Sequence, residues 1–429
     1  MKQEAPDNKK EDEKILKQWK MTKQLSNKTF NNYRNTIQHY TQATGMTITQ
    51  LYNEALQEEE DHIPRYRKQI KYHLLEFKEY LDNTSLKENS KNCYYKTIKS
   101  FYQSLDIELP RIESRYDDNP TSSTYEKLIT KDLIRLMVDN ATQRDKAILS
   151  FAAMTGQAIT EISNLDIQDI VDAWNNVLEE KIFSIDDVFK QKTSILSHDV
   201  CTLHITRQKT RNKYWVYIPK ETSRHIIDYL YERQAGANER IRITSFDTPL
   251  FVTKDGQRMP SGTVGNVFLY VGERCGFEKP ELWEDNTRLL LERGKGEQRV
   301  YTCHKYRKYF LNMCRRYAGT NSETPSEHVY TGSELGDFWI GHQARGSISH
   351  YLQYNDEDVR ELCVHYLQVL PYLSLEVEVD TLTTRDKQEF LEMKQKYEEV
   401  QRELDEFREY VKQKQKLDML AKKYGIEDI

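Results

Sequence analysis

Apolar side chains recur every three or four residues along most of the chain, the spacing of a helix with one buried face. Between residues 26 and 105 this spacing predicts four helices, the second of them short, over residues 47–59. The stripes of the other three are Phe30, Tyr33, Ile37 and Tyr40; Tyr66, Ile70, Leu74, Phe77 and Leu81; and Tyr94, Ile98, Phe101 and Leu105. We expect a small helical bundle over residues 26–115, preceded by a charged helical segment in residues 1–25.

The helical pattern stops between residues 109 and 124, where prolines and small polar residues take over. A stretch of this kind without periodicity is typical of a linker. We therefore place a linker at residues 116–124, a second domain at 125–375 and a C-terminal helical segment at 376–429.

The second domain combines helices with a small β-structure. Thr130 is expected to cap one helix, and the mostly apolar stretch Arg144–Met154 predicts a buried one. Apolar residues alternate with polar ones on both sides of residues 208–213, which predicts a β-hairpin over 199–218. The expected fold is mostly α with a small β-sheet. Residues 273–299 are charged and weakly patterned, and no role is assigned to them.

The C-terminal segment carries a short heptad pattern that ends at charged core positions, Lys414 and Asp418. Its apolar positions are Phe390, Met393, Tyr397, Val400, Leu404, Phe407 and Val411. The same pattern fits a coiled coil between two protomers and a helix that folds back on its own domain.

Composition narrows the class of protein. Charged residues make up 31% of the 429 residues, mean hydropathy is −0.82, and no apolar run approaches the roughly 20 residues of a membrane helix. The first twenty residues contain no secretory hydrophobic segment. The six cysteines are scattered without a C-x-x-C pair, which argues against a zinc site and fits a reduced, intracellular setting.

Two basic clusters stand out although the net charge is −5. Residues 301–320 contain five cations and no acid, and residues 207–224 contain six cations and one acid, Glu221. A local field of this kind attracts phosphates regardless of net charge, although a solvated helical face explains either cluster alone. The expected DNA-contacting residues are Arg207, Arg211, Lys213, Lys305, Lys308, Arg315, Arg316 and Arg345.

Residues 302–354 carry the clearest chemical pattern. His304 and Arg307 lie one helical turn apart, His342 follows Gly341, and Tyr351 comes nine residues after His342. Fixed cations beside a tyrosine suit attack on a phosphodiester, because the cations hold oxygens while the phenolate displaces an alcohol.

A second pattern lies upstream, in residues 155–170. It consists of a Thr-Gly turn at Gly156, a glutamate at Glu161, and Leu165 followed by Asp166-Ile167. Together with His304-x-x-Arg307, Gly341-His342 and Tyr351, it resembles the catalytic boxes of tyrosine recombinases (phage-type integrases). The family has an arginine two residues after the turn glycine, where this chain has Ala158.

The resemblance implies a helical core-binding (SAM-like) domain and a mixed α+β catalytic domain that cleaves and rejoins double-stranded DNA as a homo-oligomer. It implies neither metal nor nucleotide cofactor. Tyr351, rather than Tyr354, would attack the phosphate, and Lys209 on the hairpin turn would protonate the leaving oxygen. Arg307 and His342 would bind the non-bridging oxygens, His304 would assist, and Glu161 would orient neighbouring basic groups. The stretch 358–373 resembles the ending of archaeal integrases, and the long interval after Arg307 suggests an inserted loop around 321–332.

Three accounts of Ala158 remain open. The chain is an engineered, inactivated form; or a natural relative that kept DNA binding and lost the chemistry; or a protein in which Arg207, Arg211 or Arg345 supplies the missing cation. The first and third are favoured because suitable residues fill the other family positions. The rival function is a non-catalytic DNA-binding or architectural protein.

Overall fold

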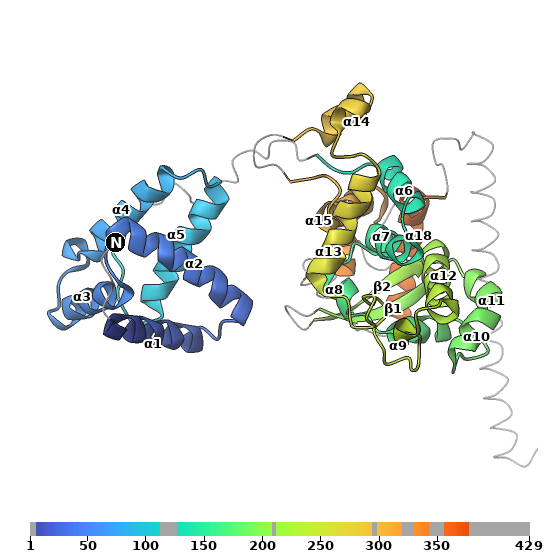
Figure 1. Cartoon of the computed structure of the whole chain (residues 1–429), viewed down its shortest axis with the longest axis horizontal. Coiled ribbons are helices and arrows are strands. Elements are labelled where there is room, and N and C mark those ends of the chain that lie inside the picture. The colour runs from blue at the N-terminus through green and yellow to red at the C-terminus, as the bar shows by residue number, and fades with distance from the viewer. Residues whose placement is uncertain are drawn as a thin grey trace, which may run out of the picture. The chain divides into compact units, whose positions relative to one another are not determined.

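The chain divides into two compact units, Met1–Glu126 and Lys127–Ile429. The structure is a computed structural model that describes residues 6–111, 127–207, 212–293, 298–319, 330–342 and 356–376 (Figure 1). Within these residues it is mostly helical with one two-stranded sheet, which confirms the predicted class.

The first unit is a helical bundle with an aromatic core. It contains α1 (Pro6–Thr22), α2 (Asn27–Thr44), α3 (Ile48–Glu60), the 3-10 turn η1 (Arg65–Arg67), α4 (Ile70–Asp82) and α5 (Glu88–Gln103). The α2 N-terminus is capped by Ser26 and that of α3 by a Thr47–Gln50 capping box, so local signals fix where these helices begin. The N-terminal segment, expected as a separate piece, packs into this bundle, because α1 buries Trp19 against Tyr33 and Phe101.

The second unit is arranged around α7 (Gln143–Thr155), which is buried on nearly all sides, as its apolar sequence predicts. The helices that precede the sheet are α6 (Lys131–Asp139), α7, α8 (Ile159–Asn164), α9 (Ile167–Asn175), α10 (Ile185–Lys190) and α11 (Lys192–Leu196). Those that follow it are α12 (Lys220–Ala235), η2 (Glu239–Ile241), α13 (Ser261–Arg274), η3 (Pro280–Leu282), α14 (Asp285–Leu291), α15 (Cys303–Tyr317), α16 (Gly332–Trp339) and α18 (Asp356–Leu373). Contacts of α7 with α6, α12, α13, α15 and α18 make it the centre of the unit.

The predicted hairpin is confirmed as an antiparallel pair, β1 (Val200–Thr206) and β2 (Lys213–Pro219). Its register pairs Leu203 with Val216 and Thr206 with Lys213. The strands pack against α7, α9, α12, α16 and α18, and β2 is buried along its whole length after Lys213. The hairpin therefore has a fixed base within the core of the unit.

The end of α18 is fastened to α6 and α12. Glu221 accepts hydrogen bonds from the Ser374 hydroxyl at 2.9 Å and from the Leu375 backbone N–H at 3.2 Å. The Nε of Arg135 donates to the Leu375 carbonyl at 2.6 Å. Burial raises the pKa of the Glu221 carboxyl above its ordinary value, although the hydrogen bonds from Ser374 and Leu375 oppose the rise. The heptad pattern of residues 390–411 lies outside the described residues.

Among the helices that the structure describes, none combines the length and the apolar character needed to cross a membrane.

Candidate active site

Two glycine turns bring the separate sequence patterns together. Gly156 ends α7 with a φ of +65°, and Gly341 follows α16 with a φ of +70°, both in the left-handed region that glycine tolerates. A Cβ on Gly156 would lie 2.4 Å from Phe310 Cδ1, and one on Gly341 would lie 2.5 Å from Tyr214 Cε1. The turns thus need glycine both for their backbone conformation and for the close packing between α7, α15, α16 and β2.

Arg307, from the middle of α15, joins the two turns. Its Nη1 donates to the Gly156 carbonyl at 3.0 Å, and its Nη2 donates to the Ile340 carbonyl at 2.8 Å. The residue is 8% exposed. Burial, and then the nearby charge of Arg207, lower the pKa of its guanidinium below the ordinary value. An arginine keeps its charge under such shifts, so a fixed cation lies at the junction of the turns.

A second arginine lies beside the first. Arg207, directly after β1, donates through Nη1 to the Gly341 carbonyl at 2.6 Å. Two guanidinium groups therefore hold neighbouring turn carbonyls, and their charges repel each other. This arrangement favours an anion between or beside them, since an anion offsets the repulsion.

Gln157, a buried side chain that the sequence analysis did not select, supports the same junction. Its amide donates to the Thr155 carbonyl at 2.9 Å and to the Trp339 carbonyl at 2.8 Å, and it accepts a hydrogen bond from the Tyr214 hydroxyl. Burial raises the pKa of Tyr214 above its ordinary value, and the charge of Glu161 raises it further. Tyr214 thus remains a neutral donor that ties the hairpin to the first turn.

Ala158 and Glu161 lie at the beginning of α8, next to this junction. Ala158 is the residue before the first helical turn, with φ −82° and ψ 162°, and its side chain is partly exposed. Glu161 is 8% exposed, and its charge acts on both Arg307 and Tyr214. The carboxylate is therefore close enough to act on Arg307 electrostatically, and its orienting role stays a prediction.

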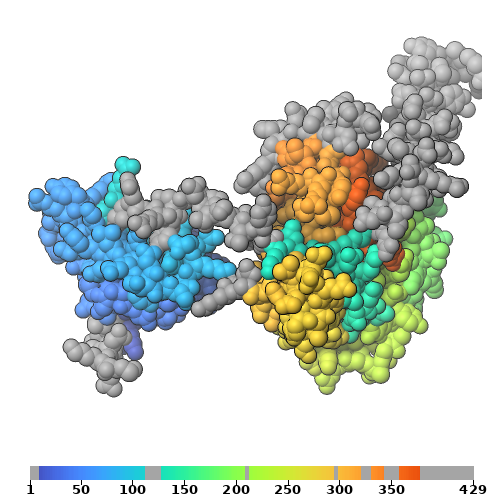
Figure 2. All heavy atoms as spheres, turned by 90° about the horizontal axis from the view of Figure 1, so that it is seen from above, coloured from blue at the N-terminus to red at the C-terminus, as the bar shows by residue number. Residues whose placement is uncertain are grey.

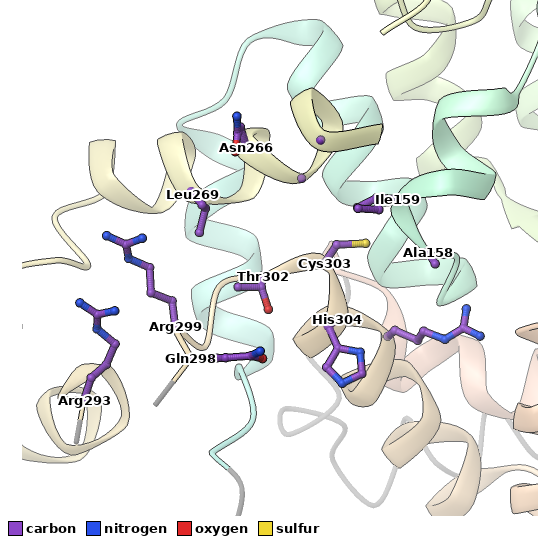
Figure 3. A pocket seen from close by; sticks show the side chains of 13 residues that line it. Ala158, Ile159, Asn266, Leu269, Arg293, Gln298, Arg299, Thr302, Cys303 and His304 are labelled. Carbon is purple, nitrogen blue, oxygen red and sulfur yellow. The ribbon is translucent and has the colours of Figure 1, made fainter. Parts of the chain in front are cut away.

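A cleft of about 640 Å³ opens beside Ala158 (Figure 3). It is lined by Ala158, His304 and Arg307, three positions that the sequence analysis placed together. Arg293 and Arg299 also line it, and no carboxylate does so among the residues that the structure describes. The cleft is thus suited to an anionic ligand.

The two histidines differ in their surroundings. His304 is exposed, lines the cleft and is the second residue of α15, whose cap residue is Thr302. His342 is exposed at the second turn, where its Nδ1 lies 2.8 Å from Asp337 Oδ1. That contact fixes the ring and directs the other nitrogen, Nε2, away from Asp337.

Cys303, next to His304, also lines the cleft. Burial raises the pKa of its thiol to about 12. The thiol is therefore protonated near neutral pH, which excludes it as a nucleophile in this state.

The predicted DNA-contacting residues on α15 and β2 divide into two groups. Arg315, Arg316 and Lys213 are exposed, and Lys308 is half-buried. Lys305 is instead 4% exposed, and its Nζ donates to the Lys127 carbonyl at 2.9 Å. Its place on a basic stretch suggested a surface position, but the helical period turns it towards the body of the unit.

Several predicted residues lie outside the described residues: the nucleophile candidates Tyr351 and Tyr354, Lys209 on the hairpin turn, Arg211 and Arg345. The loop expected around 321–332 falls there too, except for its last residues.

Within the described residues, no group of three or more histidine, cysteine, aspartate or glutamate side chains is arranged to hold a metal ion.

No family model matches this sequence, and no curated protein matches it. Solved structures do match. The XerA recombinase is 16% identical, with a TM-score of 0.31, over 82% of this chain and 97% of that chain. Lambda integrase (residues 75–356) bound to DNA is 14% identical, with a TM-score of 0.41, over the same shares of the two chains. The integrase from mycobacterium phage Brujita is 12% identical, with a TM-score of 0.30, over 89% of this chain and 96% of that chain. Similarities this low do not transfer an activity to this chain.

Proposed function

We propose that this chain is a tyrosine recombinase that cleaves and rejoins double-stranded DNA through a 3′-phosphotyrosyl intermediate. One observation carries the proposal. The Thr-Gly turn, the His-x-x-Arg helix and the Gly-His turn, which are far apart in sequence, meet at Arg307 beside a basic cleft. An accidental match of short motifs gives no reason for them to share one junction.

The chemistry assigns a step to each residue. The Tyr351 hydroxyl gives its proton to His304 as its oxygen bonds to the scissile phosphorus, and the bond from phosphorus to the 5′-oxygen breaks. Lys209 gives that oxygen its proton. Arg307 and His342 hold the non-bridging oxygens as their charge grows, and His304 assists from the cleft. Rejoining reverses these bonds and needs no cofactor, because the phosphotyrosyl link conserves the energy of the broken bond.

The same proposal assigns the rest of the chain. Residues 26–115, together with α1 packed against them, form a DNA-binding core domain, 116–124 a linker, 125–375 the catalytic domain, and 376–429 a helix that supports assembly of several copies on DNA inside the cell. The exposed cations Lys213, Arg315 and Arg316 supply phosphate contacts. Lys305 is left out of this group because it is buried.

Ala158 bears on activity. An arginine that stabilises charge in phosphoryl transfer contributes on the order of 10³ to 10⁵ in rate. Arg207 supports the account in which another cation takes over, because its guanidinium already acts on Arg307 and binds the Gly341 carbonyl. Ala158 also favours a second candidate function, a DNA-binding protein of the same architecture without strand cleavage.

A nicked suicide duplex, which traps the covalent intermediate, tests the proposal. We expect an adduct from Ala158→Arg, and none from Ala158→Arg combined with Tyr351→Phe. An adduct from the unmodified chain would assign the missing role to Arg207 or another cation. If the unmodified chain and Ala158→Arg both bind the duplex and neither forms an adduct, the non-catalytic function is correct.

A further inference from the structure

The cleft beside Ala158 extends well beyond the three predicted catalytic positions. Figure 3 shows Ala158, Ile159 and Cys303 on one side, Arg293 and Arg299 on the other, and Thr302 and His304 between them. Clefts of about 300–1,000 Å³ accommodate drug-sized ligands. At about 640 Å³ this cleft therefore has room for more than one phosphate group.

Contacts with residues that do not line the cleft position Arg299 and the backbone before Arg293. Arg299 forms an ion pair with Glu273 at 3.4 Å, and its guanidinium lies 5.9 Å from the centre of the Tyr301 ring. Arg293 directly follows Glu292, whose carbonyl accepts a hydrogen bond from the Lys127 Nζ at 2.7 Å. Lys305 in turn donates to the Lys127 carbonyl at 2.9 Å, which links the backbone before Arg293 to α15.

Arg293 and Arg299 also act on the same neighbour. Burial raises the pKa of the Tyr301 hydroxyl, and the charges of Arg299 and Arg293 oppose that rise. Both cations lie on the same side of the cleft (Figure 3). Glu273 offsets one of these charges, so one positive charge remains for a ligand in the cleft.

We propose that Arg293 and Arg299 form a second phosphate subsite, which binds a DNA phosphate neighbouring the one held by Arg307 and His342. The inference rests on the proposed function, since it requires a DNA strand in the cleft. Successive nucleotides of a strand rise by about 3.4 Å along the helix axis. If the reacting phosphate lies beside His304, a neighbouring phosphate of the same strand therefore lies further along the cleft. The subsite fixes the register of the strand, because it holds a second point along the backbone.

A phosphate scan locates this contact. The full chain first selects its best-bound duplex from a random-sequence pool. The dissociation constant is then measured on a series of that duplex, each with one phosphate replaced by a neutral methylphosphonate. Three proteins are compared: the unmodified chain, Arg293→Gln/Arg299→Gln, and the control Arg240→Gln/Arg242→Gln. The control arginines carry exposed ion pairs to Asp255 and Glu239 and do not line the cleft.

We expect one phosphate whose neutralisation weakens binding about tenfold for the unmodified chain and the control, and has no further effect on Arg293→Gln/Arg299→Gln. The single variant Arg293→Gln keeps Glu273 paired with Arg299, and it should show the same loss of coupling in part. A scan that is the same for all three proteins overturns the inference while leaving the proposed function intact.

Two other outcomes also decide the matter. If the pool yields no bound duplex, the proposed function fails and the inference fails with it. If the unmodified chain binds a free mononucleotide, and Arg293→Gln/Arg299→Gln loses that binding without a change in the scan, then the cleft serves a free nucleotide and the inference is wrong.

Discussion

The guanidinium of Arg307 donates to the carbonyl oxygen of Gly156 at 3.0 Å, across 151 positions of sequence. The acceptor belongs to a turn in the left-handed conformation, and the donor belongs to the middle of α15. The same guanidinium reaches Ile340 at 2.8 Å, so one side chain sets the distance between two turns. Arg307 is therefore a structural tie, in addition to its proposed role as the clamp on the reacting phosphate.

This double role predicts the effect of Arg307→Lys. An ammonium lacks the planar fork that reaches two carbonyls, so one acceptor is left unpaired at a cost of about 1–3 kcal/mol in the free energy of unfolding. In the Ala158→Arg background, the rate of adduct formation on the suicide duplex should fall by about 10³ or more. Urea unfolding and adduct kinetics measure the two effects. Arg240→Lys, at an exposed position that does not line the cleft, is the control and should change neither.

Gly156→Ala should destabilise the second unit through two separate effects. A left-handed alanine costs about 1–2 kcal/mol, and contact with Phe310 at 2.4 Å adds about 1–3 kcal/mol of overpacking. Gly276→Ala isolates the first effect, because Gly276 has a φ of +79° and open space around the added Cβ. Equal losses in thermal or urea unfolding for the two variants would contradict the packing at Phe310.

Lys305→Met should lower stability without changing the salt dependence of DNA binding. Its buried Nζ holds the Lys127 carbonyl, so removing it should cost about 1–3 kcal/mol in the free energy of unfolding. Arg315→Gln/Arg316→Gln should do the reverse, reducing the slope of log K against log salt by about 0.9 for each phosphate that is no longer neutralised. Unfolding and salt-dependent duplex binding are measured on both proteins. A reduced slope for Lys305→Met alone would return Lys305 to the DNA-contacting group.

The Glu221 carboxyl predicts a pH dependence of stability. Its pKa in the folded protein is raised above the ordinary value of 4.5, so the folded state binds its proton more tightly than the unfolded state does. The contribution of Glu221 is fully present below pH 4.5 and is lost as pH rises through the folded pKa. The free energy of unfolding of the unmodified chain, minus that of Glu221→Gln, should therefore fall with rising pH in that window. If this difference in the free energy of unfolding stays constant with pH, or rises, burial does not destabilise the ionised carboxylate of Glu221.

Much of the architecture could be predicted because it depends on local signals. Capping residues such as Ser26 and Thr47, the apolar stripes of α2 to α5 and the alternation in β1 and β2 each specify an element without reference to the rest of the chain. The convergence of Ala158, His304 and Arg307 on one cleft was predicted by the resemblance.

The remaining features depend on contacts between distant segments. Lys305 lies in a run of cations that reads as a surface, and only the packing of α15 against Lys127 shows that it is buried. The described part of residues 273–299 lacks a helical period because it contains only the end of α13, the 3-10 turn η3 and the short helix α14, held by contacts such as that of Trp283 with Phe277. Figure 2 shows the yellow part of the chain, which includes most of the described residues of this segment. It lies on the same face of the second unit as teal residues from the beginning of that unit and orange residues from its later part. The sequence analysis did not select Arg293 and Arg299 because the segment around them shows no helical period. Their position shortly before Thr302 and the His-x-x-Arg helix could have indicated that they lie near the cleft.

Lys127 is the first described residue of the second unit, and it forms hydrogen bonds through both its main chain and its side chain. Its carbonyl accepts from Lys305, and its Nζ donates to the Glu292 carbonyl. A pull along the chain that leads into Lys127 therefore acts directly on the helix that carries Arg307 and on the backbone before Arg293.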